Sequence, residues 1–294
     1  MAARNQGVNM RLTHGCQAVL LCMLLAGGSV HAAPQRVVST HLCTDEYVFR
    51  LVPRNHITAL SYLAGDRSPV VSTIADQVRG IDLIRGSSEE VLTRSPDLVV
   101  LYEGTNPRLR EHLVEAHIPF IEIPWADSLA QVRAVTRKLG VELDATDRAS
   151  AMLRDMDRTL ALAHTFAAEA LVPTIIYEPN GYATEGGLAD EIMAAAGLSN
   201  AAPGMSPTRS GTIPVEALVA AAPELLILDG THGRARSEAD LVLHHPAILA
   251  LAGRTSIETL TLTSLLCPGP WSVGVAPALA RLGRSALVHH TMRP

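Results

Sequence analysis

The chain has 294 residues, of which 48% are hydrophobic and 18% charged, and its formal net charge is −5 at pH 7. This length allows one large domain or two lobes with buried cores. The negative balance argues against nucleic acid as a partner, because proteins that bind a phosphate backbone present a basic surface.

The first 32 residues are typical of an export signal. They combine basic residues, an uncharged and mostly apolar run at 18–26 and a small-x-Ala sequence at 30–32. The apolar run is too short to span a bilayer as a helix. Translation can start at Met1 or at Met10. We expect a signal peptide over residues 1–32 and a product that is exported without inserting in the membrane.

Short apolar runs then alternate with helical patterns. Strands are predicted at residues 36–40, 57–60, 98–101 and 120–123, and helices at 43–51, 87–96, 107–116 and 128–139. The helix at Ser87 opens with a capping box, in which Ser87 and Glu90 satisfy each other's backbone amides. This alternation predicts a parallel sheet covered by helices on both faces.

The longest helical pattern runs from Thr146 to Ala170, with apolar residues recurring at the spacing of one buried face. Asp144 or Thr146 can accept hydrogen bonds from its first-turn amides, and Pro173 follows its last turn. At 1.5 Å per residue such a helix would be roughly 37 Å long. It divides the chain into two halves.

The second half repeats the order of the first. Strands are predicted at residues 174–177, 225–228 and 255–260, and helices at 188–196, from Pro214, at 245–252 and at 273–282. The segment from Glu89 to Leu101 can be laid on that from Glu216 to Leu228 at a constant offset of 127 residues, with the glutamate, proline, acid and strand all matching. The sequence therefore predicts an α/β fold of two similar halves.

The ordered set of motifs resembles the periplasmic binding proteins that deliver ferric siderophores and cobalamin to ABC importers. The motifs are RVVSTHLCTDE, SYLAGDRSP, EEVLTRSPDLVV, the long helix and PVEALVAAAPELLIL. This resemblance implies a class III binding protein, in which a single backbone helix joins two Rossmann-like α/β lobes. It sets the lobes at residues 33–143 and 172–294, with the helix at 144–171, and it places the product in the periplasm.

The resemblance also implies a docking surface. In that family, a glutamate on the tip of each lobe pairs with arginines of the transmembrane permease, and the matching residues here are Glu89 and Glu216. A simpler explanation is that an acid is favourable in a first helical turn. Only docking explains why both halves keep the acid at the same place.

Ligands of open parallel sheets bind beyond the carboxyl ends of the strands. The candidate ligand-binding residues at such places are Tyr62, Tyr102, Trp125, Tyr182, Trp271, Arg85, Asp229 and His232, with Glu103 at the same rim. Aromatic walls with a few polar groups suit a large, flat or greasy ligand. Each aromatic residue alone can equally well pack against its own lobe.

We expect no metal site, no cofactor and no catalysis. His41, Cys43 and Cys267 could ligate a metal, but such residues are more often packed or solvated. We expect the two cysteines to be free thiols, because a cleft wide enough for a corrin would hold their Cα atoms more than about 7 Å apart. A bound haem would take Tyr102 or His232 as its axial ligand.

The resulting hypothesis is a binding protein that captures a ferric siderophore or cobalamin and passes it to an ABC-importer permease. One alternative is a haem- or metal-ion-binding protein of the same fold. A secreted α/β hydrolase is a weaker alternative, because the chain after residue 32 has no GxSxG or HExxH motif.

Overall fold

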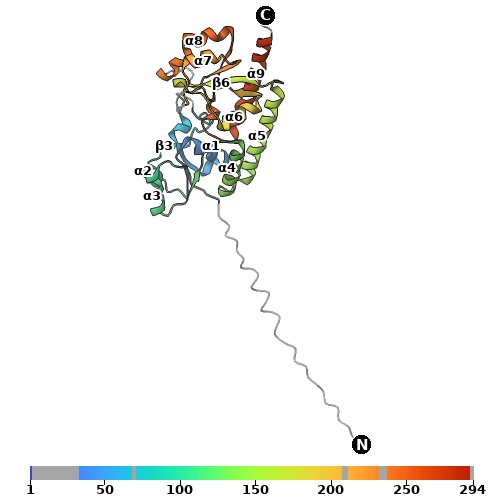
Figure 1. Cartoon of the computed structure of the whole chain (residues 1–294). Helices are drawn as coiled ribbons and strands as arrows, with labels where there is room; N and C mark the ends of the chain where they lie inside the picture. The colour runs from blue at the N-terminus through green and yellow to red at the C-terminus, as the bar shows by residue number, and fades with distance from the viewer. Residues whose placement is uncertain (2–32, 68–70, 207–210, 232–236, 292–294) are drawn as a thin grey trace. The chain divides into compact units, whose positions relative to one another are not determined.

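The computed structural model describes Met1 and residues 33–67, 71–206, 211–231 and 237–291. The predicted export signal therefore lies outside the described residues, apart from Met1. Residues 34–294 form one compact unit that contains two parallel sheets (Figure 1). In the described part of the chain, no helix has the length and apolar character needed to cross a membrane.

The first sheet has five strands in the order β3-β2-β1-β4-β5, all of them parallel. They are β1 (Val37–Ser39), β2 (Ile57–Ser61), β3 (Asp82–Ile84), β4 (Leu98–Tyr102) and β5 (Phe120–Ile123). The helices of this part are α1 (Leu42–Leu51), α2 (Ser88–Leu92), α3 (Pro107–Glu115) and α4 (Leu129–Glu142). We call this part the first lobe.

The capping box at Ser87 is confirmed, whereas β3 was not predicted because two of its three residues are exposed and it begins with an aspartate.

The second sheet has four parallel strands in the order β7-β6-β8-β9. They are β6 (Val172–Tyr177), β7 (Leu198–Asn200), β8 (Leu225–Asp229) and β9 (Ser256–Leu260). The helices are α6 (Gly187–Ala195), α7 (Val215–Ala221), α8 (Pro246–Leu249) and α9 (Ala276–Thr291). We call this part the second lobe. The closing helix starts at Ala276 rather than at 273, because residues 270–275 form a 3₁₀ segment.

Short 3₁₀ segments complete the description: η1 (Arg54–His56), η2 (Tyr62–Gly65), η3 (Pro179–Gly181), η4 (Glu238–His244), η5 (Ala250–Gly253), η6 (Thr263–Leu265) and η7 (Pro270–Val275). The internal repeat is visible in the strand order, since β2-β1-β4-β5 corresponds to β7-β6-β8-β9. Strands β4 and β8 start 127 residues apart, at Leu98 and Leu225. The predicted α/β fold of two similar lobes is confirmed.

Helix α5 (Thr146–Phe166) packs against α4 of the first lobe and α9 of the second (Figure 1). Its 21 residues make it about 31 Å long, shorter than predicted because Ala167 turns to an extended conformation. Pro173 lies inside β6 instead of closing the helix. The predicted cap was also wrong: Ala145 is the N-cap residue, and Asp144 has a left-handed backbone (φ 51°) in the tight turn after α4.

A glycine allows this turn to close. A Cβ at Gly140 of α4 would lie 2.6 Å from the Cβ of Ala149 in α5, so the two helices could not approach as closely with any other residue. One buried apolar cluster then runs from Val100 in the first sheet through Met156 of α5 to Ile176 and Leu279 in the second lobe. The lobes thus share a core along α5, and their boundaries at residues 143 and 172 stay a prediction.

Candidate ligand-binding cleft

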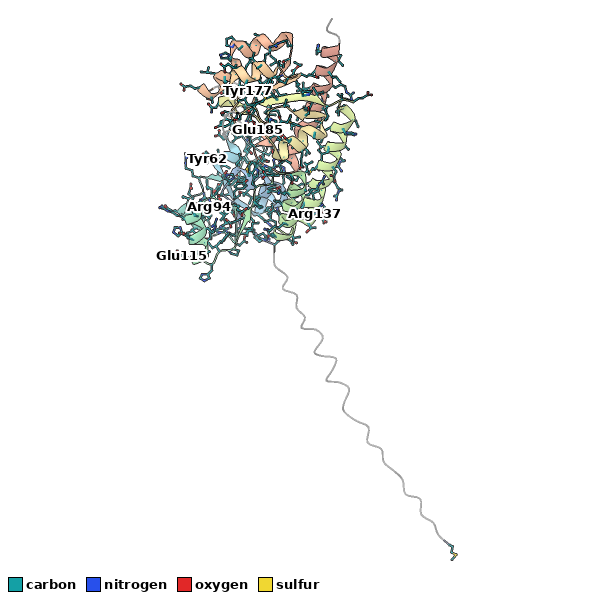
Figure 2. All side chains as sticks on the ribbon, viewed as in Figure 1. Tyr62, Arg94, Glu115, Arg137, Tyr177 and Glu185 are labelled. Atoms are coloured by element: carbon teal, nitrogen blue, oxygen red, sulfur yellow. A yellow bond between two sulfur atoms is a disulfide. The ribbon has the colours of Figure 1, made fainter. Side chains whose placement is uncertain are left out.

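The segments that follow several strands of the first lobe meet the second lobe. Cys43, just after β1, is joined by a disulfide to Cys267, which precedes η7. The backbone N–H of Leu129 donates a 2.7 Å hydrogen bond to the Glu191 carboxylate of α6. Figure 2 shows Tyr62 of the first lobe and Glu185 of the second close to the level at which the two lobes meet. Segments of both lobes therefore meet in one region.

The disulfide corrects the expectation of two free thiols. The Cα atoms of Cys43 and Cys267 are 5.0 Å apart, within the range that a disulfide requires. Both residues are buried and pack with Leu42, Leu63 and Tyr102. The expectation was wrong because the bond lies in a packed floor between the lobes and does not have to cross an open cleft.

His41 stands at the entrance of α1, where it acts as the N-cap residue. Its Nδ1 accepts a 3.2 Å hydrogen bond from the Cys43 backbone N–H, and its ring stacks on that of Tyr102 with centroids 4.5 Å apart. Burial lowers the pKa of His41, which favours the neutral imidazole. Because Nδ1 is the acceptor, the proton of the neutral ring is on Nε2. In this tautomer His41 is a hydrogen-bond donor and does not offer a lone pair to a metal.

The rings of His41, Tyr102 and Trp125 form a continuous row, which we call the aromatic wall. Tyr102 and Trp125 meet edge to face with ring centroids 6.4 Å apart, and 52% of Trp125 is exposed. The Tyr102 hydroxyl is buried and has no hydrogen-bond partner among the described residues. Burial, followed by the charges of Asp127 and Glu103, raises the pKa of Tyr102 to about 12. The burial of this hydroxyl works against Tyr102 as the axial ligand of a haem iron.

Tyr62 and Arg85 form a second aromatic group in the first lobe. Tyr62 follows β2 directly and is 45% exposed, and the Arg85 guanidinium lies over its ring at 5.2 Å from the centroid. A cation above an aromatic face is an attractive contact. This pair offers a ring edge and a positive charge at the ends of β2 and β3.

Two cavities lie between the lobes. One has a volume of about 470 Å³ and is lined by Trp125 and Asp127 from the first lobe and by residues 185–189, Leu265 and Pro268 from the second. The other has a volume of about 460 Å³ and is lined by Ser72, Thr73, Ala75 and Asp76, by residues of 260–264 and by Gly274, Val275 and Ala278. Of the sequence-predicted aromatic residues, only Trp125 lines either of them.

Trp271 lies elsewhere. Its ring meets Tyr47 edge to face at 4.8 Å, Arg50 covers it at 4.6 Å, and its indole N–H donates to the Cys267 carbonyl at 3.0 Å. It lines a separate hollow of about 210 Å³ that also includes Met156 of α5. Trp271 therefore packs the junction of the lobes and is not grouped with Trp125.

The other sequence-predicted polar and aromatic residues are more dispersed. Tyr182 is 45% exposed and forms an isolated bridge with Thr212. The Asp229 carboxylate, at the end of β8, accepts hydrogen bonds from the N–H and the hydroxyl of Thr231. His232 lies outside the described residues. No group of three or more histidine, cysteine, aspartate or glutamate residues in the described ranges is placed to hold a metal ion.

Sequence reasoning missed two buried acids of α1, Asp45 and Glu46. The Asp45 carboxylate accepts hydrogen bonds from the N–H of Ser61 at 3.0 Å and from its hydroxyl at 2.5 Å. The Glu46 carboxylate accepts from the N–H and hydroxyl of Thr73, both at 2.6 Å, and pairs with Arg50 at 2.5 Å. These two acids hold both ends of the segment that carries Tyr62. Adjacent acids in a helix with a buried face are the signal that could have indicated them.

Glu89 and Glu216 occupy equivalent positions. Each is the second residue of a short helix, α2 or α7, that precedes the corresponding strand of its lobe. Both are exposed, and neither is ion-paired with a described residue. The internal repeat therefore places one free carboxylate on each lobe.

A model of the family described as periplasmic binding protein matches residues 50–251, more than half of the chain. No curated protein sequence matches this chain at a significant level. The fold is similar to that of the periplasmic heme-binding protein RhuT from Roseiflexus sp. RS-1, with 20% identity and a TM-score of 0.68 over 86% of this chain and 98% of RhuT.

Two further solved structures are similar. The periplasmic vitamin B12 binding protein BtuF of Vibrio cholerae has 14% identity and a TM-score of 0.61, covering 87% of this chain and 98% of BtuF. FhuD2 from Staphylococcus aureus has 15% identity and a TM-score of 0.64, covering 86% of this chain and 99% of FhuD2. At these identities the likeness shows the fold.

The disulfide generates a stability prediction. Replacing both Cys43 and Cys267 by serine should lower the free energy of unfolding by about 2–5 kcal/mol, because the bond closes a loop of more than two hundred residues in the unfolded chain. Chemical denaturation with and without reductant measures this, and the double variant should not respond to reductant. Peptide mapping without reduction should give a Cys43–Cys267 linked pair, whereas alkylation of both residues in the denatured, unreduced protein would contradict the bond.

Asp45 generates a pH prediction. Burial raises its pKa to about 7, whereas the unfolded value is near 3.8. The folded state therefore holds this proton more tightly, so the stabilisation is complete below about pH 4 and is lost as the pH rises through 7. Each pKa unit corresponds to about 1.4 kcal/mol, so the free energy of unfolding should fall by a few kcal/mol between pH 5 and pH 8. Asp45→Asn should flatten this decrease in denaturation curves, and the exposed Asp147→Asn should keep it. The same slope in both variants would contradict the assignment.

Proposed function

The chain belongs to the periplasmic binding protein family, and we propose that it captures a metal chelate, a ferric siderophore or cobalamin, between its lobes and delivers it to an ABC-importer permease. The observation that carries this proposal is the inter-lobe cavity of about 470 Å³ beside the wall of His41, Tyr102 and Trp125. Aromatic faces with a few polar groups are typical of sites for large, flat organic ligands. The fold is that of class III periplasmic binding proteins.

The proposed action is binding and release. The exposed ring of Trp125 in the aromatic wall suits contact with the organic part of a chelate, and Tyr62 with Arg85 adds a second contact group. His41 in its neutral form can donate a hydrogen bond from Nε2. These residues hold no nucleophile–base pair, so the proposal includes no catalysis. Export by the signal peptide predicted over residues 1–32 to the periplasm belongs to the same proposal.

Haem is the second candidate ligand, since RhuT is described as heme-binding. The buried hydroxyl of Tyr102 and the tautomer of His41 disfavour both as iron ligands. The exposed phenol of Tyr62 is a candidate iron ligand in the first lobe. A ferric siderophore or cobalamin brings its own metal ligands and needs no such group from the protein, so these chelates stand first in the proposal.

The permease is the proposed partner, because proteins of this family work with ABC-importer permeases. Glu89 and Glu216 are the proposed contacts, supported by their exposure and equivalent positions at the second residue of α2 and α7. Two carboxylates at the same place of a repeated unit suit a partner with matching basic residues. An acid in a first turn also favours the helix by a few tenths to one kcal/mol, so only a transport assay separates the two roles.

Ligand binding can be tested with the two tryptophans of the chain. Cyanocobalamin, ferric siderophores and haem absorb light, so a bound chelate should quench the fluorescence of nearby Trp125 in a saturable way. The quenching should persist in Trp271→Phe and be largely lost in Trp125→Phe, because Trp125 lines the cavity and Trp271 does not. No saturable change with any member of this panel would contradict the proposed function.

Docking has a separate test. Reversal of both charges, Glu89→Arg with Glu216→Arg, should abolish uptake of the chelate in cells and leave the ligand affinity of the purified protein unchanged, because rim charges chiefly control recognition between proteins. Glu115→Arg in α3, also exposed, is the matched control and should leave uptake intact. Normal uptake by the double variant, or loss of its ligand affinity in vitro, would show that these glutamates do not dock the permease.

A further inference from the structure

The cavity beside Trp125 is built by both lobes. Asp127 and Trp125 come from the loop after β5, and residues 185–189 form the opposite wall. Gly187 of this wall has a left-handed backbone (φ 68°), a conformation that favours glycine over other residues. The hydrogen bond from the Leu129 backbone N–H to the Glu191 carboxylate joins the two lobes close to these residues. Residues of both lobes therefore define the shape of this cavity.

The charges around this cavity are negative. The carboxylates of Asp127 and Glu185 belong to exposed residues that line it, and no arginine or lysine is among the described residues of its lining. Glu103, at the end of β4, is also exposed, and its charge with that of Asp127 contributes to the raised pKa of Tyr102. None of these three acids is ion-paired with a described residue. An anionic group that entered the cavity would be repelled.

The aromatic wall beside the cavity also favours a cation. The exposed ring of Trp125 forms one wall, and the face of an indole attracts cations. An exposed indole and two acids without an ion pair among the described residues, all lining one cavity, match a positively charged organic group.

We propose that the cavity lined by Trp125, Asp127 and Glu185 is a subsite for a positively charged group of the ligand. This inference rests on the function proposed above and narrows it. The ligand is a chelate without net negative charge, and its positively charged part occupies the subsite. Chelates whose periphery carries carboxylates or catecholate charge, haem included, are disfavoured by the same acids.

The test compares chelates that differ by one positive charge. One pair is ferrioxamine B, which carries a free ammonium group, and its uncharged N-acetyl derivative; the other is aquacobalamin and cyanocobalamin. Calorimetric titration of the wild-type protein at low ionic strength should show that the cationic member of the pair that binds does so about tenfold more tightly. This advantage should shrink as salt is added, because the acids are exposed.

Variants then locate the effect. Asp127→Asn with Glu185→Gln should remove the difference within the pair and keep the affinity for its uncharged member. Glu111→Gln with Glu115→Gln, two exposed acids of α3, changes the net charge equally and should preserve the difference. Equal affinities within each pair, tighter binding of haem or a ferric catecholate than of the cationic chelates, or an undiminished difference in the Asp127/Glu185 variant would overturn the subsite. If no chelate binds at all, the proposed function itself fails.

Discussion

The attachment of α1 to the segment 267–271 is the constraint on which the cleft depends. Cys43, Tyr47 and Arg50 are spaced four and three residues apart, so they share one face of the helix. That face carries the disulfide to Cys267 and both contacts with the Trp271 ring. The lobes are therefore joined twice, along α5 and through α1. Both attachments oppose a hinge motion between the lobes.

The same helix orders the ligand side of the first lobe. His41 caps it and stacks on Tyr102, while Asp45 and Glu46 hold Ser61 and Thr73. A buried carboxylate is tolerated only when hydrogen bonds replace its hydration, and each of these acids has several donors. The segment between Ser61 and Thr73 is thus fixed at both ends. A single helix sets the position of both aromatic groups, Tyr62 on one side and Tyr102 on the other.

Local patterns were enough for much of the fold. The capping box at Ser87 and strand β5 depend on neighbours in sequence, and they are found where the pattern indicated. The end of α5 and the short strands β3 and β7 depend on tertiary pairing, so the sequence did not reveal them. The disulfide joins residues 224 positions apart, and its formation depends on how the lobes pack. Trp125 and Trp271 look alike in the sequence, and only packing separates a cavity wall from a buried junction.

A clamped pair of lobes also constrains how a permease could recognise the loaded protein. Glu89 and Glu216 lie on different lobes, and the disulfide and the shared core along α5 join these lobes. If the two glutamates dock as proposed, these links would keep their spacing nearly the same in the empty and loaded forms. Their charges would then provide affinity for the permease without reporting occupancy. Discrimination of the loaded form would have to come from the ligand itself or from segments at the cleft that it contacts.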